Sequence, residues 1–300
     1  MPIVTVQDFT GVYAKQPFMQ GLRESAATDK NINWFDCTQI DGTDCYCDDE
    51  AQAALHKMMD DAVAKASAAT SHAINTPGIH FFDNGNYHYM SKLWTDQVQE
   101  PFDLVVFDHH PDMQPPRFEG ILSCGGWIKE VLDHNKFVQN VTVIGVADHL
   151  VEEIREDLSQ ANSAKILNRV TFIRESELKN HLENLSSLVC SELASVHSSN
   201  LYISIDKDAL STAEASTNWD QGSLTIEQLA DTLKILAQNH KILGVDICGE
   251  RARDMGFEDT AAADALNNAL NEQLYNLITT LVEKEMPAFA GMTATKYGLQ

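Results

Sequence analysis

The sequence is poor in basic residues, and this scarcity excludes several kinds of partner. Its 300 residues include 21 Lys and Arg against 44 Asp and Glu, which gives a formal net charge of −23 at pH 7. Nucleic acids are bound through clustered Lys and Arg side chains, so we expect no nucleic acid partner. The same deficit disfavours an anionic membrane surface. The acidic excess suits a self-repelling, soluble surface, and it can also concentrate divalent cations and cationic substrates.

Long apolar runs and regular cysteine spacing are also lacking. No stretch approaches the length of a membrane-spanning helix, and the N-terminal region lacks the parts of a signal peptide. The six cysteines follow no framework spacing, and Cys45 with Cys47 forms an isolated C-x-C pair without a nearby His or Cys partner. We therefore expect reduced thiols in a cytoplasmic protein. No GxGxxG or Walker pattern indicates a nucleotide-binding site.

Short apolar runs that alternate with helical patterns dominate the sequence. The runs are almost continuous in apolar residues, which is typical of strands covered on both faces, and the segments between them have amphipathic helical spacing. This alternation predicts an α/β fold with a mainly parallel sheet. No linker or repeat interrupts it, so we expect one domain over residues 1–300, with 286–300 a tail or an oligomer contact. The predicted strands are Ile3–Val6, Ile32–Phe35, Ile79–Phe82, Leu104–Phe107, Val141–Val146, Val170–Ile173, Leu201–Ile205 and Ile242–Ile247, and the predicted helices are Glu50–Ala69, Leu122–Phe137, Thr225–Asn239 and Ala261–Glu285.

Acidic residues and histidines follow several of the predicted strands. In open α/β sheets, ligands bind beyond the carboxyl ends of the strands. Two of these strands are followed by acids or histidines at alternate positions, which can face the same side as a strand ends. A third strand is followed, a few residues later, by another histidine. The six residues expected to form a site at this edge are His88, Asp108, His110, Asp112, Asp206 and Asp208.

Four closely spaced carboxylates need compensating positive charge. Without it, each would repel the others and their pKa values would rise, whereas two divalent cations remove the repulsion. Carboxylate oxygens and imidazole nitrogens suit Mn²⁺, Fe²⁺, Co²⁺ or Zn²⁺, and the lack of a thiolate in the set favours Mn²⁺. We expect His109, between two of these residues, to point away from the site. Asp246, within the last predicted strand, is either a support for a ligand or an ordinary strand-end acid.

The order and spacing of these motifs resemble those of the arginase, agmatinase and formiminoglutamase family of ureohydrolases. The resemblance rests on the segments Gly85–His88, Asp108–Asp112 and Ser204–Asp208, and it runs from about the first strand to the last long helix. It implies a three-layer αβα fold around an eight-stranded, mainly parallel sheet. It also implies a binuclear centre with two Mn²⁺ ions per chain.

The resemblance further implies a role for each ligand. One histidine and one aspartate would bind each ion and two aspartates would bridge both: His88 with Asp112, His110 with Asp208, and Asp108 with Asp206. Two cations that share a water molecule lower its pKa, so that hydroxide can cleave a C–N bond of a guanidino or formimino compound. Asp112 would accept a proton. Glu250 is the second candidate catalytic residue, as a carboxylate that faces the substrate cation, and Asp148 and Glu250 are the candidates for binding the small cationic substrate.

The substrate side departs from arginase itself. The second acidic residue that arginases carry near Asp148 is Leu150 here, and the position of the family glutamate is Gly249, with Glu250 one residue later. The histidine that follows the second motif is also absent, and either Cys124 or His149 could replace it. We therefore expect that free arginine is not the substrate, because altered polar contacts change specificity. Agmatine, guanidinobutyrate, formiminoglutamate or another guanidino compound remain open.

Two other interpretations remain. Zinc deacetylases of the same superfamily keep one metal and part of this ligand set, but the presence of His88, Asp112 and Asp208 favours two metals. The chain could also be a non-catalytic, metal-binding regulatory protein, because a fold does not determine a function. A homo-oligomer is an expectation by analogy with the family.

Overall fold

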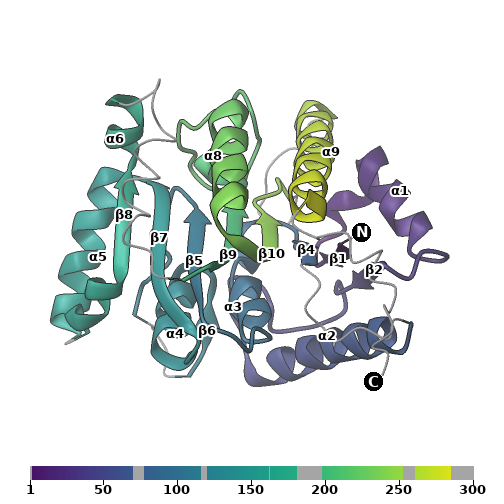
Figure 1. Ribbon diagram of the computed structural model, residues 1–300, viewed down its shortest axis with the longest axis horizontal. Coiled ribbons are helices and arrows are strands. Elements are labelled where there is room, and N and C mark those ends of the chain that lie inside the picture. The colour runs from purple at the N-terminus through teal and green to yellow at the C-terminus, as the bar shows by residue number, and fades with distance from the viewer. Residues whose placement is uncertain are drawn as a thin grey trace, which may run out of the picture.

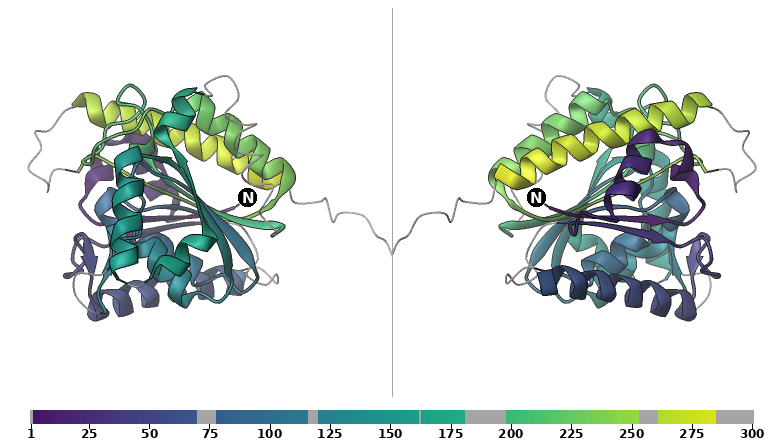
Figure 2. Two further views of the ribbon diagram at one scale, coloured as in Figure 1. Left: turned by 90° about the vertical axis from the view of Figure 1, so that its left-hand side faces the viewer. Right: turned by 90° about the vertical axis from the view of Figure 1, so that its right-hand side faces the viewer.

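The structure is a computed structural model that describes residues 2–69, 78–115, 120–161, 163–180, 198–252 and 261–284. An eight-stranded sheet forms its middle layer, and helices cover both faces of the sheet (Figures 1 and 2). The predicted tail, 286–300, lies outside the described residues. The sheet consists of β1 (Ile3–Asp8), β2 (Ile32–Asp36), β4 (Gly78–Phe81), β5 (Phe102–Phe107), β7 (Val138–Val146), β8 (Val170–Arg174), β9 (Asn200–Asp206) and β10 (Lys241–Cys248).

The eight strands are all parallel to their neighbours, in the order β2-β1-β4-β10-β9-β5-β7-β8. Every residue of β5 is buried, and its side chains alternate between two cores. Val105 and Phe107 belong to one core, whereas Leu104 and Val106 belong to the other. This alternation explains the continuous apolar runs, because each face of the sheet is covered. The predicted strands and the three-layer α/β fold are confirmed.

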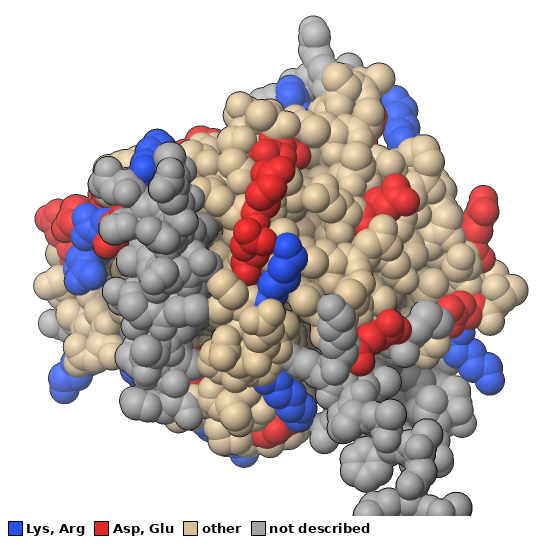
Figure 3. All heavy atoms as spheres, turned by 45° about the horizontal axis from the view of Figure 1, so that its top comes forward, with Lys and Arg blue, Asp and Glu red and all other residues tan. Residues whose placement is uncertain are grey.

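Helices complete the outer layers. No described helix combines the length and the apolar character that a membrane crossing requires. On the face drawn in Figure 3, the described Lys and Arg side chains are scattered rather than gathered in a patch. One core is covered by α1 (Pro17–Ser25), α6 (Glu175–Asn180), α8 (Ile226–Asn239) and α9 (Ala261–Lys284), and the other by α2 (Asp49–Ala69), α3 (Met90–Thr95), α4 (Trp127–His134) and α5 (Asp148–Gln160). Short 3₁₀ helices lie at Val12–Lys15, Gly85–Tyr87, Cys124–Gly126, Ala164–Arg169 and Lys207–Ala209.

The predicted helices agree with the structure except for one. The helix expected over Leu122–Phe137 is wrong at both ends, because β6 (Leu122–Ser123) pairs antiparallel with β3 (Tyr46–Cys47) at its start and the backbone is extended at Asn135, after α4 ends. A 3₁₀ turn with two glycines, which have low helix propensity, then separates β6 from α4. The start of α8 follows its sequence signal, since Thr225 and Gln228 form a capping box.

The carboxyl ends of the central strands gather at one edge of the sheet. Because β9 lies between β10 and β5, the residues that follow these three strands become neighbours. In the ladder between β9 and β10, Asp206 lies opposite Cys248. The 3₁₀ helix after β4 carries the chain to His88 at the same edge. The parallel topology therefore brings together segments that are distant in sequence.

Candidate metal centre

A cavity of about 360 Å³ lies at this edge of the sheet. The six expected ligands line this cavity, and all of them except His110 are buried. They come from the segments after β4, β5 and β9. The structure thus collects in one place the whole set that we expected from the strand ends. The cavity lining includes His88, Asp108, His110, Asp112, Asp206 and Asp208.

His88 is surrounded by carboxylates on one side of its ring. Its Nδ1 atom lies 3.1 Å from Asp108 Oδ2 and 3.0 Å from Asp112 Oδ2. Asp206 Oδ2 is 3.5 Å from the same nitrogen. On the other side of the ring, Nε2 lies 2.9 Å from Ser204 Oγ. This second contact fixes the ring with Nδ1 toward the carboxylates, as outer partners of metal-binding histidines do.

His110 has a similar arrangement. Its Nδ1 atom lies 2.9 Å from Asp208 Oδ2 and 3.4 Å from Asp108 Oδ1. Its Nε2 atom lies 3.1 Å from Asp220 Oδ1. The sequence did not indicate Asp220, because it lies in the loop after β9 without a motif of its own. A carboxylate behind an imidazole is a common partner of a metal-binding histidine.

Asp108 lies between the two histidines and contacts both, one with each carboxylate oxygen. Asp108 Oδ2 is buried and has no hydrogen-bond partner among the described residues. Two groups that could hold a metal ion share this residue, and within each group the ligand atoms lie within 4.8 Å of one another. The chemistry of the donors and the unsatisfied oxygen therefore fit a pair of divalent cations. These groups are His88–Asp108–Asp112 and Asp108–His110–Asp208.

Asp112 is held by an unusual backbone conformation. Its φ is 44°, in the left-handed region that few residues other than glycine adopt. Its Oδ2 atom accepts a hydrogen bond of 2.8 Å from Trp127 Nε1. The indole thereby holds the carboxylate toward His88. Strained backbone conformations of this kind are found preferentially at functional sites.

Burial and mutual repulsion perturb the titration of the cluster. Burial, together with the charge of Asp208, raises the pKa of Asp206 to about 7. Burial alone would lower the pKa of His88, but the contacts with Asp108 and Asp112 raise it well above its ordinary value. The pKa of His110 is raised in the same way. Protons therefore supply the positive charge of this cluster, and a metal ion would displace them.

Glu250 does not face the cavity, contrary to our expectation for a substrate-binding residue. Its side chain is fully buried, and Lys207 Nζ donates a hydrogen bond to Oε1. The amide groups of three further residues complete its surroundings: Gln16, Asn267 and Asn271. Gly249 explains this direction, since its φ is +90° and a Cβ atom there would lie 2.3 Å from Asp206 Oδ1. The chain turns sharply against Asp206 and carries the glutamate away from the cavity.

Asp148 also lies away from the cavity lining. It begins α5, where its carboxylate accepts hydrogen bonds from the Ser176 backbone N–H at 3.1 Å and from Ser176 Oγ at 2.5 Å. The Ser176 hydroxyl lowers the pKa of Asp148. The carboxylates that α5 contributes to the cavity are Glu153 and Asp157, which lie one helical turn apart. The three- and four-residue spacing of positions 150, 153, 154 and 157 was the available signal for this face.

Four other candidates have different surroundings. Cys124 lines the cavity and its backbone N–H donates to Cys45 O at 2.9 Å, whereas His149 is exposed and outside the lining. His109 is buried, and its Nδ1 lies 3.2 Å from Gly145 O, away from the cavity as expected. Asp246 lies within the sheet and contacts His80 Nδ1 at 2.7 Å.

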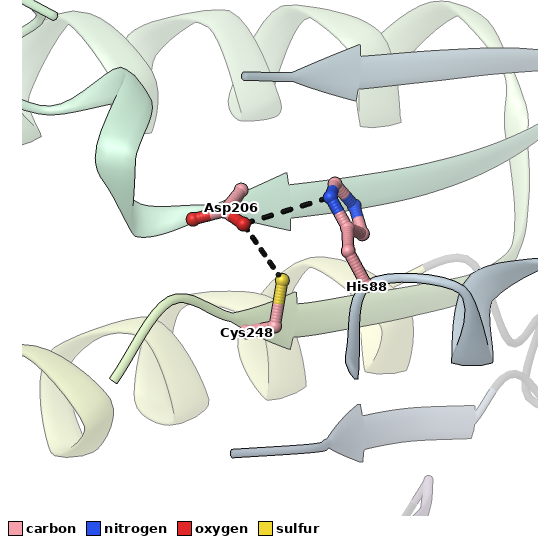
Figure 4. A group of neighbouring side chains, drawn as sticks. All are labelled: His88, Asp206 and Cys248. Carbon is pink, nitrogen blue, oxygen red and sulfur yellow. Dashed lines mark hydrogen bonds and ion pairs between the residues drawn. The ribbon is translucent and has the colours of Figure 1, made fainter. Parts of the chain in front are cut away.

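One buried thiol at the cluster was not expected. Cys248 Sγ donates a hydrogen bond of 3.2 Å to Asp206 Oδ2, the oxygen that also faces His88 (Figure 4). A third group that could hold a metal ion is formed by these three residues. Cys248 directly follows the predicted strand Ile242–Ile247, and its sequence context indicated no partner. Only the pairing of β9 with β10 brings the thiol to the carboxylate.

Known proteins are similar to this chain in sequence and in fold. The sequence matches the arginase family over residues 15–265. An uncharacterized protein of Thermotoga maritima is 27% identical over 250 residues, which are 83% of this chain and 80% of that protein. The sequence therefore has a relative of similar length.

Solved structures share the fold at low sequence identity. The agmatine ureohydrolase of Thermoplasma volcanium has a TM-score of 0.61 and 13% identity, covering 95% of this chain and 92% of its own. The formimidoylglutamase of Bacillus subtilis also has a TM-score of 0.61 with 13% identity, over 93% and 86% of the two chains. The arginase of Bacillus caldovelox has a TM-score of 0.57 and 12% identity, over 92% and 98%. With a family match that spans most of the sequence and all six clustered residues, this chain belongs to the arginase family.

Proposed function

We propose that this protein is a two-metal hydrolase that cleaves a C–N bond of a guanidino compound other than free arginine. The observation that carries the proposal is the pair of metal-capable groups that share Asp108. A single shared carboxylate between two imidazole–carboxylate groups is suited to two neighbouring cations. A one-metal deacetylase would leave one of these groups, His88 with Asp112, without a purpose.

We propose manganese as the metal, with His88 and Asp112 at one ion, His110 and Asp208 at the other, and Asp108 and Asp206 shared. Two bound ions would supply the positive charge that activates a water molecule and offsets the charge developing on the substrate.

The remaining steps belong to the chain itself. Asp112 would accept a proton and return it to the leaving nitrogen. The hydrogen bond from Trp127 orients the carboxylate for that transfer.

The lining of the cavity indicates the charge of the substrate. None of the described residues that line it is a Lys or Arg, whereas Glu153 and Asp157 lie at its α5 side. A substrate whose far end is anionic would find no basic partner among these residues. A guanidino compound whose far end is cationic or neutral would find the carboxylates of Glu153 and Asp157 together with the apolar side chains of Leu150 and Trp219.

The same lining disfavours free arginine. Its α-amino and α-carboxylate groups both need polar partners, because buried polar groups without partners oppose binding. Leu150 and Ile154 occupy the helix face beside the cavity, and Glu250 is already satisfied by Lys207. We therefore place guanidino amines such as agmatine ahead of arginine, formiminoglutamate and guanidinobutyrate.

A substrate screen tests the proposal. The metal-free protein is reloaded with Mn²⁺, its metal content is measured, and the release of urea or amine is followed for agmatine, guanidinobutyrate, arginine and formiminoglutamate. We expect turnover that is fastest for the guanidino amine. Full metal loading without any product would contradict the proposal and favour a non-catalytic role. One zinc ion per chain with hydrolysis of acetylated amines would favour a deacetylase.

A further inference from the structure

The thiol of Cys248 has surroundings that differ from those of other buried cysteines in the described residues. Cys248 is the last residue of β10, and its fully buried Sγ lies 3.2 Å from Asp206 Oδ2. Cys37 is also buried, but its Sγ faces the backbone oxygen of Phe35 at 3.8 Å. The buried Cys47 lies beside Tyr89. Only the thiol of Cys248 has both a carboxylate and an imidazole as neighbours in a metal-capable group.

The orientation of the three side chains in this group is favourable for a common ligand. Figure 4 shows Asp206 and Cys248 at the ends of neighbouring strands, with the ring of His88 directed toward the same carboxylate. Their nitrogen, oxygen and sulfur atoms all lie within 4.8 Å of one another. Each is a donor type that transition metals accept, and the thiolate is the softest of the three.

An independent observation is that a buried carboxylate oxygen beside this group lacks a hydrogen-bond partner among the described residues. Asp108 Oδ2 is buried without a hydrogen-bond partner among the described residues, and it lies 3.1 Å from His88 Nδ1. The same nitrogen faces Asp206 Oδ2, which accepts from the thiol. A cation beside His88 Nδ1 would satisfy the oxygen of Asp108, and the group that contains Cys248 shares His88 with the group that contains Asp108.

We propose that Cys248 is a thiolate ligand of the ion that His88 holds, an inference that rests on the metal centre of the proposed function. On binding, the S–H bond breaks, the proton leaves to water and a sulfur–metal bond forms, with no change of oxidation state. A thiolate raises the affinity of this position for Zn²⁺, Co²⁺ and Fe²⁺ relative to Mn²⁺, so manganese would occupy it where manganese is the metal in excess, whereas the His110 position has oxygen and nitrogen ligands alone.

Cobalt binding provides a test that does not depend on turnover. Metal-free full-length protein is titrated with Co²⁺ while visible bands report bound cobalt and a near-ultraviolet charge-transfer band reports a thiolate ligand. We expect the wild type to show both signals. Cys248→Ser should keep the visible bands and lose the charge-transfer band. Cys124→Ser, which removes a thiol from the same cavity, is the matched control and should keep both.

The outcomes separate this inference from the proposed function. Visible bands without a charge-transfer band in the wild type would overturn the thiolate ligand alone. The same holds for a charge-transfer band that survives Cys248→Ser or disappears in Cys124→Ser. Wild-type protein that retains no cobalt would overturn the metal centre, and the inference with it.

A second measurement avoids any change at Cys248. Zinc-loaded Cys124→Ser protein is studied by X-ray absorption, where a zinc–sulfur distance of about 2.3 Å is expected. A spectrum fitted by oxygen and nitrogen alone would overturn the inference. In competition experiments, we expect Cys248→Ser to lose at least about tenfold of the preference for Zn²⁺ over Mn²⁺. An unchanged preference would also contradict it.

Discussion

The carboxylates of Asp206 and Asp208 and the carboxylate of Glu250 are all buried near residues 206–208, but their charges are balanced in different ways. Asp206 and Asp208 line the cavity together with Asp108, and among the residues that the structure describes, the imidazoles of His88 and His110 offer them positive charge. Glu250 lies outside the cavity, where Lys207 and amide donors satisfy it. Burial is therefore no guide to metal binding by itself. A buried acid is available to a cation only where the protein has not already balanced its charge.

The three residues 206–208 divide between these two environments. Asp206 and Asp208 point to the cavity, whereas the side chain of Lys207, between them, is buried against Glu250. The lysine thereby anchors the segment that carries two of the proposed ligands. Substitutions on either side of this segment test whether the two environments differ in this way.

Asp108→Asn should have the largest effect, because it removes the carboxylate shared by both metal-capable groups. We expect bound metal to fall from two ions per chain to one or fewer, and turnover to fall by on the order of 10³-fold or more. Elemental analysis and steady-state kinetics measure these changes.

Asp103→Asn is the matched control, since Asp103 is equally buried in β5 but bonds Asn140 and Ser198 outside the cavity. It should keep both ions. Normal metal content in Asp108→Asn, or an equal loss in the control, would contradict the assignment.

Glu250→Gln should act on stability rather than on substrate contact. The change leaves the Lys207 ammonium buried without its counter-charge, which costs about 3–5 kcal/mol in the free energy of unfolding. Chemical denaturation of the metal-free protein measures the loss. The double variant Lys207→Met with Glu250→Gln should recover most of it. A Glu250→Gln protein of normal stability but with a selectively raised KM would restore the substrate-binding role that the structure does not support.

The sequence predicted the strands and the clustering of six residues, because both follow from local pattern and parallel topology. Apolar runs specify buried strands, and acids directly after them must meet at the carboxyl edge of the sheet. The contacts of Cys248 and Asp220 could not be predicted in this way. They depend on which strand pairs with which and on how one loop returns to the cavity.

The direction of Glu250 depended on a single backbone angle. Its place next to the expected position was visible in the sequence, but the positive φ of Gly249 and its close approach to Asp206 were not. The predicted start of α4 was wrong for a related reason. The apolar pattern from Leu122 onward is compatible with a helix, but Leu122 and Ser123 pair with another strand. Tertiary contacts decided both cases.

The pH dependence of stability should differ between the metal-free and metal-loaded protein. The pKa of Asp206 is raised to about 7 from 3.8, so the folded metal-free chain binds more protons than the unfolded chain between these values. The raised pKa of His88 acts in the same direction above about pH 6.5. Both effects lower the free energy of unfolding as pH rises.

We therefore expect the metal-free protein to be more stable at pH 5 than at pH 8. Metal ions compete with these protons, so the gain in melting temperature on adding Mn²⁺ should grow over the same range. Thermal unfolding with and without Mn²⁺ measures it. A gain that is equal at both pH values would show that the cluster does not exchange protons for metal.

The smallest effect is expected on the substrate side. Glu153→Gln should raise KM for a guanidino amine by about fivefold with little change in kcat, because an exposed charge contributes about 1 kcal/mol or less. Asp148→Asn, whose native carboxylate bonds Ser176 outside the cavity, is the control and should leave KM unchanged. The reverse result, with KM sensitive only to Asp148, would move the substrate to the other end of α5.

The most direct measurement is anomalous diffraction from crystals of the protein loaded with Mn²⁺. We predict two ions per chain, one beside His88 and one beside His110, with the carboxylates of Asp108 and Asp206 in contact with both. A single ion, or ions bound away from Asp108, would contradict the two-metal centre on which the proposed hydrolase depends.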